Sequence, residues 1–63
     1  MKKREDIITE MCYTVRHDYG LIKGTYDYAW QSGMTQDERD ELYQQMSQIF
    51  DNNIAPHMTF IKD

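Results

Sequence analysis

The stretch that decides the fold is TQDERDELYQQMSQIF, residues 35–50. Thr35 is followed three residues later by Glu38, which is the spacing of a helix capping box. Apolar side chains then recur at the intervals of one helical face, at Leu42, Tyr43, Met46, Ile49, Phe50 and Ile54. The sequence therefore predicts an amphipathic helix over residues 36–52, with Thr35 and Glu38 as its cap.

The stop signals of this helix follow directly. Asn52 and Asn53 can end it, and Pro56 prevents much continuation because proline has no backbone N–H. Residues 56–63 then form a short tail, which we expect to be less ordered. Three of its apolar side chains could fold back on the core: Met58, Phe60 and Ile61.

A second amphipathic pattern lies upstream, in EDIITEMCYTVRHDYGLI, residues 5–22. On a helical wheel, an arc of about 140° holds its apolar residues Ile7, Ile8, Met11, Cys12, Val15, Tyr19 and Ile22. We predict a helix over residues 5–18, with Gly20 just beyond its end. Because Ile22 still fits the stripe, continuation past Gly20 remains an alternative.

The stretch between the two helices, GTYDYAW at residues 24–30, is ambiguous. Tyr26, Tyr28 and Trp30 alternate with the period of a strand, but one strand has no partner in so short a chain. We favour a loop with a helical turn around residues 27–32, with Asp27 as N-cap. The three aromatic side chains either close the open end of the helix pair or form a docking surface for another protein.

Length and charge restrict the class of protein. A chain of 63 residues forms one domain at most and buries only about 60 % of its unfolded surface. Its single cysteine, Cys12, allows no internal disulfide and is read as a buried small hydrophobe in a reducing cytoplasm. We therefore expect either a partner chain or very good packing to compensate for the small buried surface. The net charge of -4 has the wrong sign for a nucleic-acid-binding protein, and the basic residues 2–4 are a short exception.

No catalytic or metal-binding pattern is visible, so we expect no enzyme activity and no cofactor. Cys12 and His17 are five residues apart on a helix and point about 140° apart, so they cannot form a nucleophile–base pair. His17 and His57 lack the spacing of a zinc site. The acidic run at residues 37–41 lacks the glycine and ligand spacing of a calcium loop and is read as a solvated helix start. No targeting signal or membrane-spanning run is present.

Three segments taken together carry a family resemblance: DIITEMCYTVRHDYGL, WQSGMT and ERDELYQQMSQIFDNNIAPHMTFIKD. They resemble the small early proteins that lambdoid bacteriophages encode between the recombination exonuclease and excisionase genes. The resemblance covers nearly the whole chain and rests on overall similarity rather than on a mechanistic motif. It implies a helical protein without enzyme activity, made early in the host cytoplasm and associated with the lysis–lysogeny decision and host physiology. It assigns no functional residues.

These observations together predict an all-α protein with one helical domain over residues 1–63, in which the basic arm at residues 1–4 is less ordered. Two amphipathic helices would form a homodimeric bundle whose core or dimer seam contains Ile8, Met11, Val15, Leu42, Met46, Ile49 and Phe50. The candidate partner surface consists of Tyr26, Tyr28 and Trp30. The predicted function is regulation through binding of a host or phage protein. The alternative is a nucleic-acid-binding regulator that uses the basic arm with Arg16 and Lys23.

Overall fold

The computed structural model describes residues 1–20 and 27–62. Its elements, in chain order, are α1 (Arg4–Asp18), the 3₁₀ helix η1 (Asp27–Gln31), α2 (Gln36–Ile49), the π-helical turn η2 (Phe50–Ile54) and the 3₁₀ turn η3 (Ala55–His57). Within the described residues no strand forms, apart from an isolated parallel bridge between Lys3 and Ile61. The predicted all-α class is therefore confirmed for this part of the chain.

The first helix, α1, begins one residue before its predicted start and ends where the prediction placed it. Glu5 and Asp6 lie in its first turn, where their negative charge complements the helix dipole. Gly20 adopts a φ of +73°, and its N–H donates to the carbonyl of His17 at 3.0 Å. A left-handed glycine just beyond the last turn satisfies an otherwise free carbonyl. The helix therefore ends before Gly20. Residues 21 and 22, where the alternative placed its continuation, lie outside the described residues.

The start of α2 has the predicted capping box. The hydroxyl of Thr35 accepts a hydrogen bond from the N–H of Glu38 at 3.2 Å, and the Glu38 carboxylate accepts from the N–H of Thr35 at 2.9 Å. The backbone hydrogen bond from Thr35 holds the pKa of Glu38 below its ordinary value. Two N–H groups that a helix start leaves unpaired are thus satisfied reciprocally.

The end of α2 differs from the prediction. The regular helix ends at Ile49, but the backbone continues through η2 and η3 to His57, so Asn52 and Asn53 lie inside a π-helical turn rather than terminating a helix. Pro56 is tolerated because it occupies the first turn of η3, where a backbone N–H has no partner within the helix. Phe50 at the start of η2 and Ile54 at its end both pack on the core. Their burial outweighs the weak stop signals of the two asparagines.

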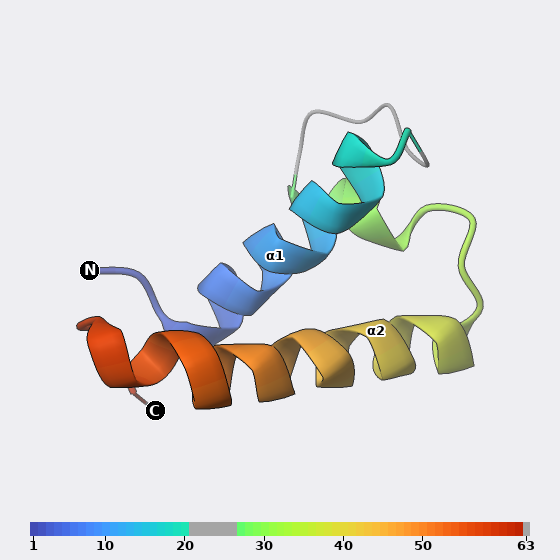
Figure 1. Cartoon of the computed structure of the whole chain (residues 1–63). Helices are drawn as coiled ribbons and strands as arrows, with labels where there is room; N and C mark the ends of the chain where they lie inside the picture. The colour runs from blue at the N-terminus through green and yellow to red at the C-terminus, as the bar shows by residue number, and fades with distance from the viewer. Residues whose placement is uncertain (21–26, 63) are drawn as a thin grey trace.

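The two main helices, α1 and α2, run at an angle to each other rather than side by side (Figure 1). The two chain ends lie together at one side of the molecule, while η1 lies at the other side, next to the last turns of α1. The short helix η1 matches the predicted helical turn around residues 27–32. It supplies the third element that two splayed helices need to enclose a core.

The arm and the tail, which we expected to be less ordered, are joined by backbone hydrogen bonds. The N–H of Arg4 donates to the carbonyl of Ile61 at 3.2 Å, and the N–H of Ile61 donates to the carbonyl of Lys2 at 3.0 Å. Phe60 then reaches the core, where its ring meets Phe50 edge to face at a centroid distance of 5.0 Å. The tail therefore folds back as its apolar residues suggested, although Met58 and Ile61 stay largely exposed.

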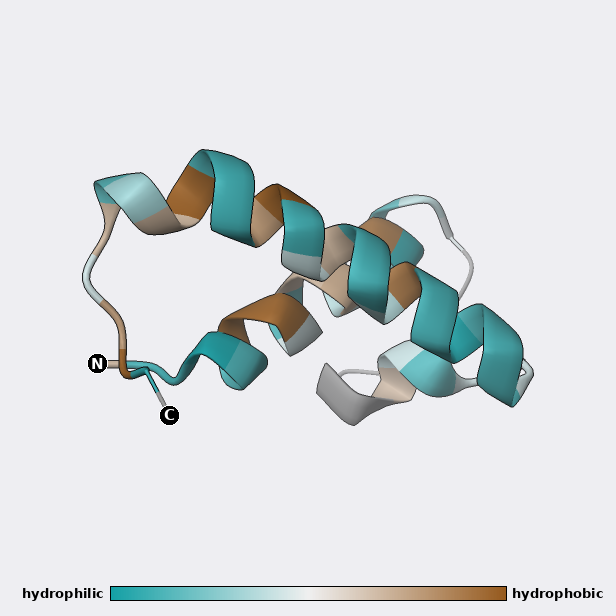
Figure 2. Cartoon of the chain, turned by 90° about the horizontal axis from the view of Figure 1, so that it is seen from below, coloured by the Kyte–Doolittle hydropathy of each residue, from teal (hydrophilic) through white to brown (hydrophobic). Residues whose placement is uncertain are grey.

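The core is small. Among the described residues, the buried hydrophobic side chains are Ile8, Cys12, Trp30 and Phe50. They come from α1, from η1 and from the start of η2, and α2 itself contributes none of them. In Figure 2, hydrophobic segments recur at intervals along both main helices, and α2 is otherwise largely hydrophilic. A core of this size leaves several apolar side chains only partly covered.

Candidate functional site

Trp30 does not belong to the surface on which we predicted it. Its side chain is only 4 % exposed and lies in the core. The 3₁₀ conformation of η1 replaces the strand-like alternation, so the period of two no longer describes which side chains face outward. Trp30 therefore closes the helix pair, which was the other role considered for it. Tyr26 and the side chain of Tyr28 lie outside the described residues, so their predicted surface role is untested.

One guanidinium fixes η1 in this position. The Nη1 of Arg16, on α1, donates to the carbonyl of Trp30 at 3.1 Å and to the carbonyl of Ser32 at 3.0 Å. Carbonyls at the end of a short helix have no partner within it, and a cation there is favoured. The sequence offered no signal for this role because the two partners are backbone atoms in a distant segment.

The residues predicted for a core or dimer seam divide into two groups. Ile8 and Phe50 are fully buried in the core of the single chain. The others remain at least partly accessible, and Ile49 is 43 % exposed: Met11, Val15, Leu42, Met46 and Ile49. The fold of the single chain thus buries two of the seven predicted residues completely and leaves the other five partly exposed to solvent.

Part of this remaining apolar area lies around Met46, whereas Leu42 does not line the surface described next. Ile7, Met11 and Val15, one helical turn apart on α1, line a shallow groove together with Met46 of α2. Met46 also borders a neighbouring hollow that contains Ile49. We call these five residues the apolar face: Ile7, Met11, Val15, Met46 and Ile49. Met46 joins its two parts, so the face extends across both helices.

The surroundings of the apolar face on α2 carry no charge. Between Glu41 and Asp51 the sequence reads LYQQMSQIF, nine residues without an ionisable acid or base other than the tyrosine. The polar residues beside Ile49 on this surface are amides, namely Gln45, Gln48, Asn52 and Asn53. Depletion of charge around an apolar centre is the composition of protein–protein interfaces.

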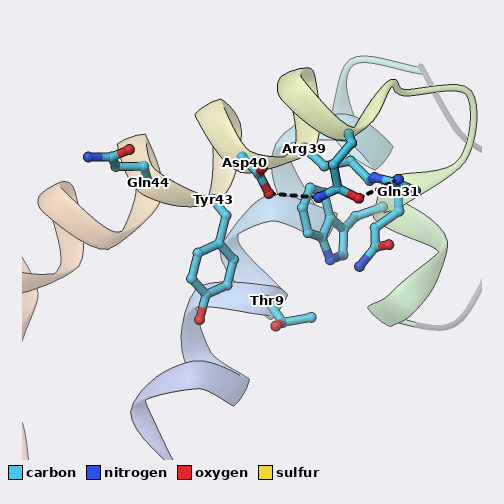
Figure 3. A pocket seen from close by; sticks show the side chains of 8 residues that line it. Thr9, Gln31, Arg39, Asp40, Tyr43 and Gln44 are labelled. Atoms are coloured by element: carbon cyan, nitrogen blue, oxygen red, sulfur yellow. Dashed lines mark hydrogen bonds between the residues drawn. The ribbon is translucent and has the colours of Figure 1, made fainter.

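A separate hollow, which shares no lining residue with the apolar face, opens between α1, η1 and α2 and has a volume of about 630 Å³ (Figure 3). The rings of Trp30 and Tyr43 form its base, with centroids 6.5 Å apart and an interplanar angle of 28°. On one wall, the Gln36 amide donates to the Asp40 carboxylate at 2.8 Å and accepts from the Arg39 guanidinium at 2.8 Å. Aromatic, amide and charged groups from three elements therefore face the same space.

Three basic residues of the alternative function are engaged within the fold, whereas Lys3 is exposed. Lys2 forms an ion pair with Glu10. Arg4 holds Asp51 with two hydrogen bonds, from Nε to Oδ1 at 3.0 Å and from Nη2 to Oδ2 at 2.9 Å. Arg16 is bound to the carbonyls of η1, and Lys23 lies outside the described residues. No row of free cations therefore forms in the part of the chain that the structure describes.

The described residues contain no cluster of three or more His, Cys, Asp or Glu side chains that could hold a metal ion. Burial raises the pKa of the Cys12 thiol to about 11, which disfavours the thiolate that nucleophilic chemistry requires. His17 instead stacks on Tyr13, with ring centroids 5.2 Å apart, on the far side of the helix wheel from Cys12. None of the described helices combines the length and apolar character needed to cross a bilayer.

Comparison with known proteins found no matching family model, no similar curated protein and no similar solved structure.

Proposed function

We propose that this protein is a non-enzymatic regulatory module that acts by binding protein through the apolar face. The observation that carries the proposal is the continuity of Ile7, Met11, Val15, Met46 and Ile49 across two helices, in uncharged surroundings on α2. The uncharged border on α2 loses little polar solvation when a partner covers it, whereas Glu10 lines the groove on the α1 side.

A second copy of the chain is the first partner that we propose. Few side chains are buried among the described residues, and neither a disulfide nor a metal cluster within them compensates for the small core. Small domains of this kind gain stability by association. A two-fold pair would form a four-helix arrangement in which each apolar face covers the other.

The resemblance to lambdoid phage early proteins suggests where the module acts and what it binds. There the module would act in the cytoplasm of the bacterial host, and its further partner would be a host or phage protein that influences phage development. No observation favours the nucleic-acid-binding alternative, since Lys2, Arg4 and Arg16 are bound within the fold.

The experiment compares two substitutions that add the same charge to α2. Ile49→Asp places a carboxylate in the apolar face, whereas Gln44→Asp places it at the hollow beside Tyr43, on a different side of the helix. Sedimentation equilibrium over a wide micromolar range should show dimers for the wild type and for Gln44→Asp, but monomers for Ile49→Asp, because a buried unpaired charge is strongly unfavourable. Val15→Asp should act like Ile49→Asp from the α1 side.

The melting temperature gives an independent measure, since it rises with protein concentration when only the dimer buries the face. A wild-type chain that remains monomeric and folded throughout, with a constant melting temperature, would rule out self-association. The wider proposal would then be tested by capture of a host or phage partner on immobilised wild type and Ile49→Asp protein. Equal capture by both would contradict a role for the apolar face.

A further inference from the structure

Arg39 lies in the wall of the hollow with its hydrogen-bonding capacity only partly used. Its Nη2 donates to the side-chain oxygen of Gln36 at 2.8 Å. Its Nε is buried and has no hydrogen-bond partner, and no described carboxylate lies within ion-pairing distance of the guanidinium. Buried polar groups of native proteins are rarely left in this state. The Nε–H of Arg39 is therefore a donor without an acceptor among the described residues.

Arg4 shows what the same edge of a guanidinium does elsewhere in this protein. There Nε and Nη2 donate in parallel to the two oxygens of Asp51, at 3.0 Å and 2.9 Å. This fork matches a carboxylate, and such charged hydrogen bonds are stronger than those to a neutral amide. In Arg39 the corresponding edge has a neutral amide oxygen on Nη2 and no partner on Nε. A carboxylate would therefore be a better acceptor for Nε and Nη2 of Arg39 than the amide of Gln36.

The hollow next to Arg39 can accommodate the rest of a ligand. Its volume of about 630 Å³ falls in the range of small-molecule pockets, about 300–1,000 Å³. Tyr43 and Trp30 provide an aromatic base. Thr9 and Gln31 contribute polar groups from α1 and η1 (Figure 3). An acid with a flat apolar body would place that body on the aromatic base and its charge at the Arg39 wall.

We propose that this hollow binds an organic carboxylate with an aromatic or apolar body. Binding requires the Gln36 side chain to turn away and open the buried Nε to the ligand. The two carboxylate oxygens then accept from Nε and Nη2 of Arg39, while the body lies against Tyr43. Gln36 is exposed and can turn towards solvent. Asp40 opposes the binding electrostatically, but it is also exposed, so water and salt screen its charge.

Two sources share this chemistry, and nuclear magnetic resonance titration distinguishes them. Phenylacetate represents a free organic acid, and N-acetylphenylalanine represents the carboxyl terminus of a peptide. Phenylacetamide and N-acetylphenylalanine amide are the matched uncharged probes. We expect an acid to shift the Nε–H signal of Arg39 and the indole N–H signal of Trp30 in a saturable way, and its amide to leave both unchanged. Whichever acid binds more tightly identifies the source.

Four variants test the assignment of the atoms. Arg39→Gln and Arg39→Lys should each weaken binding at least about tenfold, because neither offers the paired donors. Gln36→Ala should strengthen binding by removing the competing amide. Lys62→Gln removes a cation that lies over Phe60, outside the hollow, and should leave binding unchanged.

Other outcomes would overturn the proposal. These are equal binding of acid and amide, no shift by either acid at millimolar concentration, weaker binding by Gln36→Ala, or undiminished binding by a folded Arg39→Lys protein. Circular dichroism of each variant verifies the fold. None of these results depends on the apolar face, so they are independent of the proposed protein binding.

Discussion

Replacing Trp30 by alanine is expected to remove most of the stability of the folded chain. The side chain is 4 % exposed, and burial of an aromatic residue removes about 150–250 Å² from water. At about 25 cal/mol per Å² this corresponds to about 4–6 kcal/mol, an upper estimate since unfolded chains already bury some surface. Measured losses for such truncations are about 3–5 kcal/mol. A domain of this length has a total stability of about 3–9 kcal/mol.

The assay is urea denaturation followed by far-ultraviolet circular dichroism, because the variant loses the only tryptophan. Tyr19→Ala is the matched control: this aromatic side chain is 79 % exposed, and its loss should change stability by less than about 0.5 kcal/mol. Trp30→Phe retains most of the ring burial and should fall between the two. If Trp30→Ala unfolds at the wild-type urea concentration with the same slope, the side chain does not close the core and the reasoning fails.

Three further predictions concern the helix cap, an ion pair and the thiol. Thr35→Ala should cost about 1 kcal/mol by removing the capping box, and an unchanged urea midpoint at unchanged slope would contradict the assignment. The hydrogen bonds from Arg4 hold the pKa of Asp51 below its ordinary value. The stabilisation by this ion pair is therefore present near neutral pH and is lost as the pH falls through the folded-state pKa. Asp51→Asn should make the free energy of unfolding fall less steeply towards acid pH, and identical acid profiles of variant and wild type would refute this. Burial raises the pKa of Cys12 to about 11, so Ellman's reagent at pH 8 should react with the thiol only in denaturant, and rapid reaction of the native protein would show that Cys12 is accessible.

The helix starts and the end of α1 were predictable because their signals are local. Thr35 and Glu38 satisfy each other across one turn, and Gly20 adopts a conformation that other residues avoid. Each signal lies within a few residues of the boundary that it determines. The hydrophobic period of 3.6 likewise identified both main helices without knowledge of what they pack against.

The end of α2 and the position of Trp30 depend on distant contacts. Asn52 and Asn53 look like stop signals locally, but Phe50 meets Phe60 in the core and the helical path continues. The exposure of Trp30 depends on the conformation of η1, which Arg16 holds from another helix. Tertiary packing overrides short-range preference at both places.

The pairing of arm and tail could not have been predicted in this way. It joins Lys2, Arg4 and Ile61 through backbone atoms, which every residue carries. Side-chain patterns therefore contain no record of it. The hollow beside Arg39 is a similar case, because it exists only where three elements meet.

The bond from Arg16 to η1 has a consequence for the way the native structure fluctuates. Because one guanidinium holds the carbonyls of both Trp30 and Ser32, η1 cannot lift away unless the last turns of α1 release it. Amide protons in these two segments should then exchange with solvent as a single cooperative unit, with matching opening free energies, although η1 begins at Asp27, 11 positions after Arg16 in the sequence. Loosening the side chain of Arg16 would therefore open the end of α1 and η1 together.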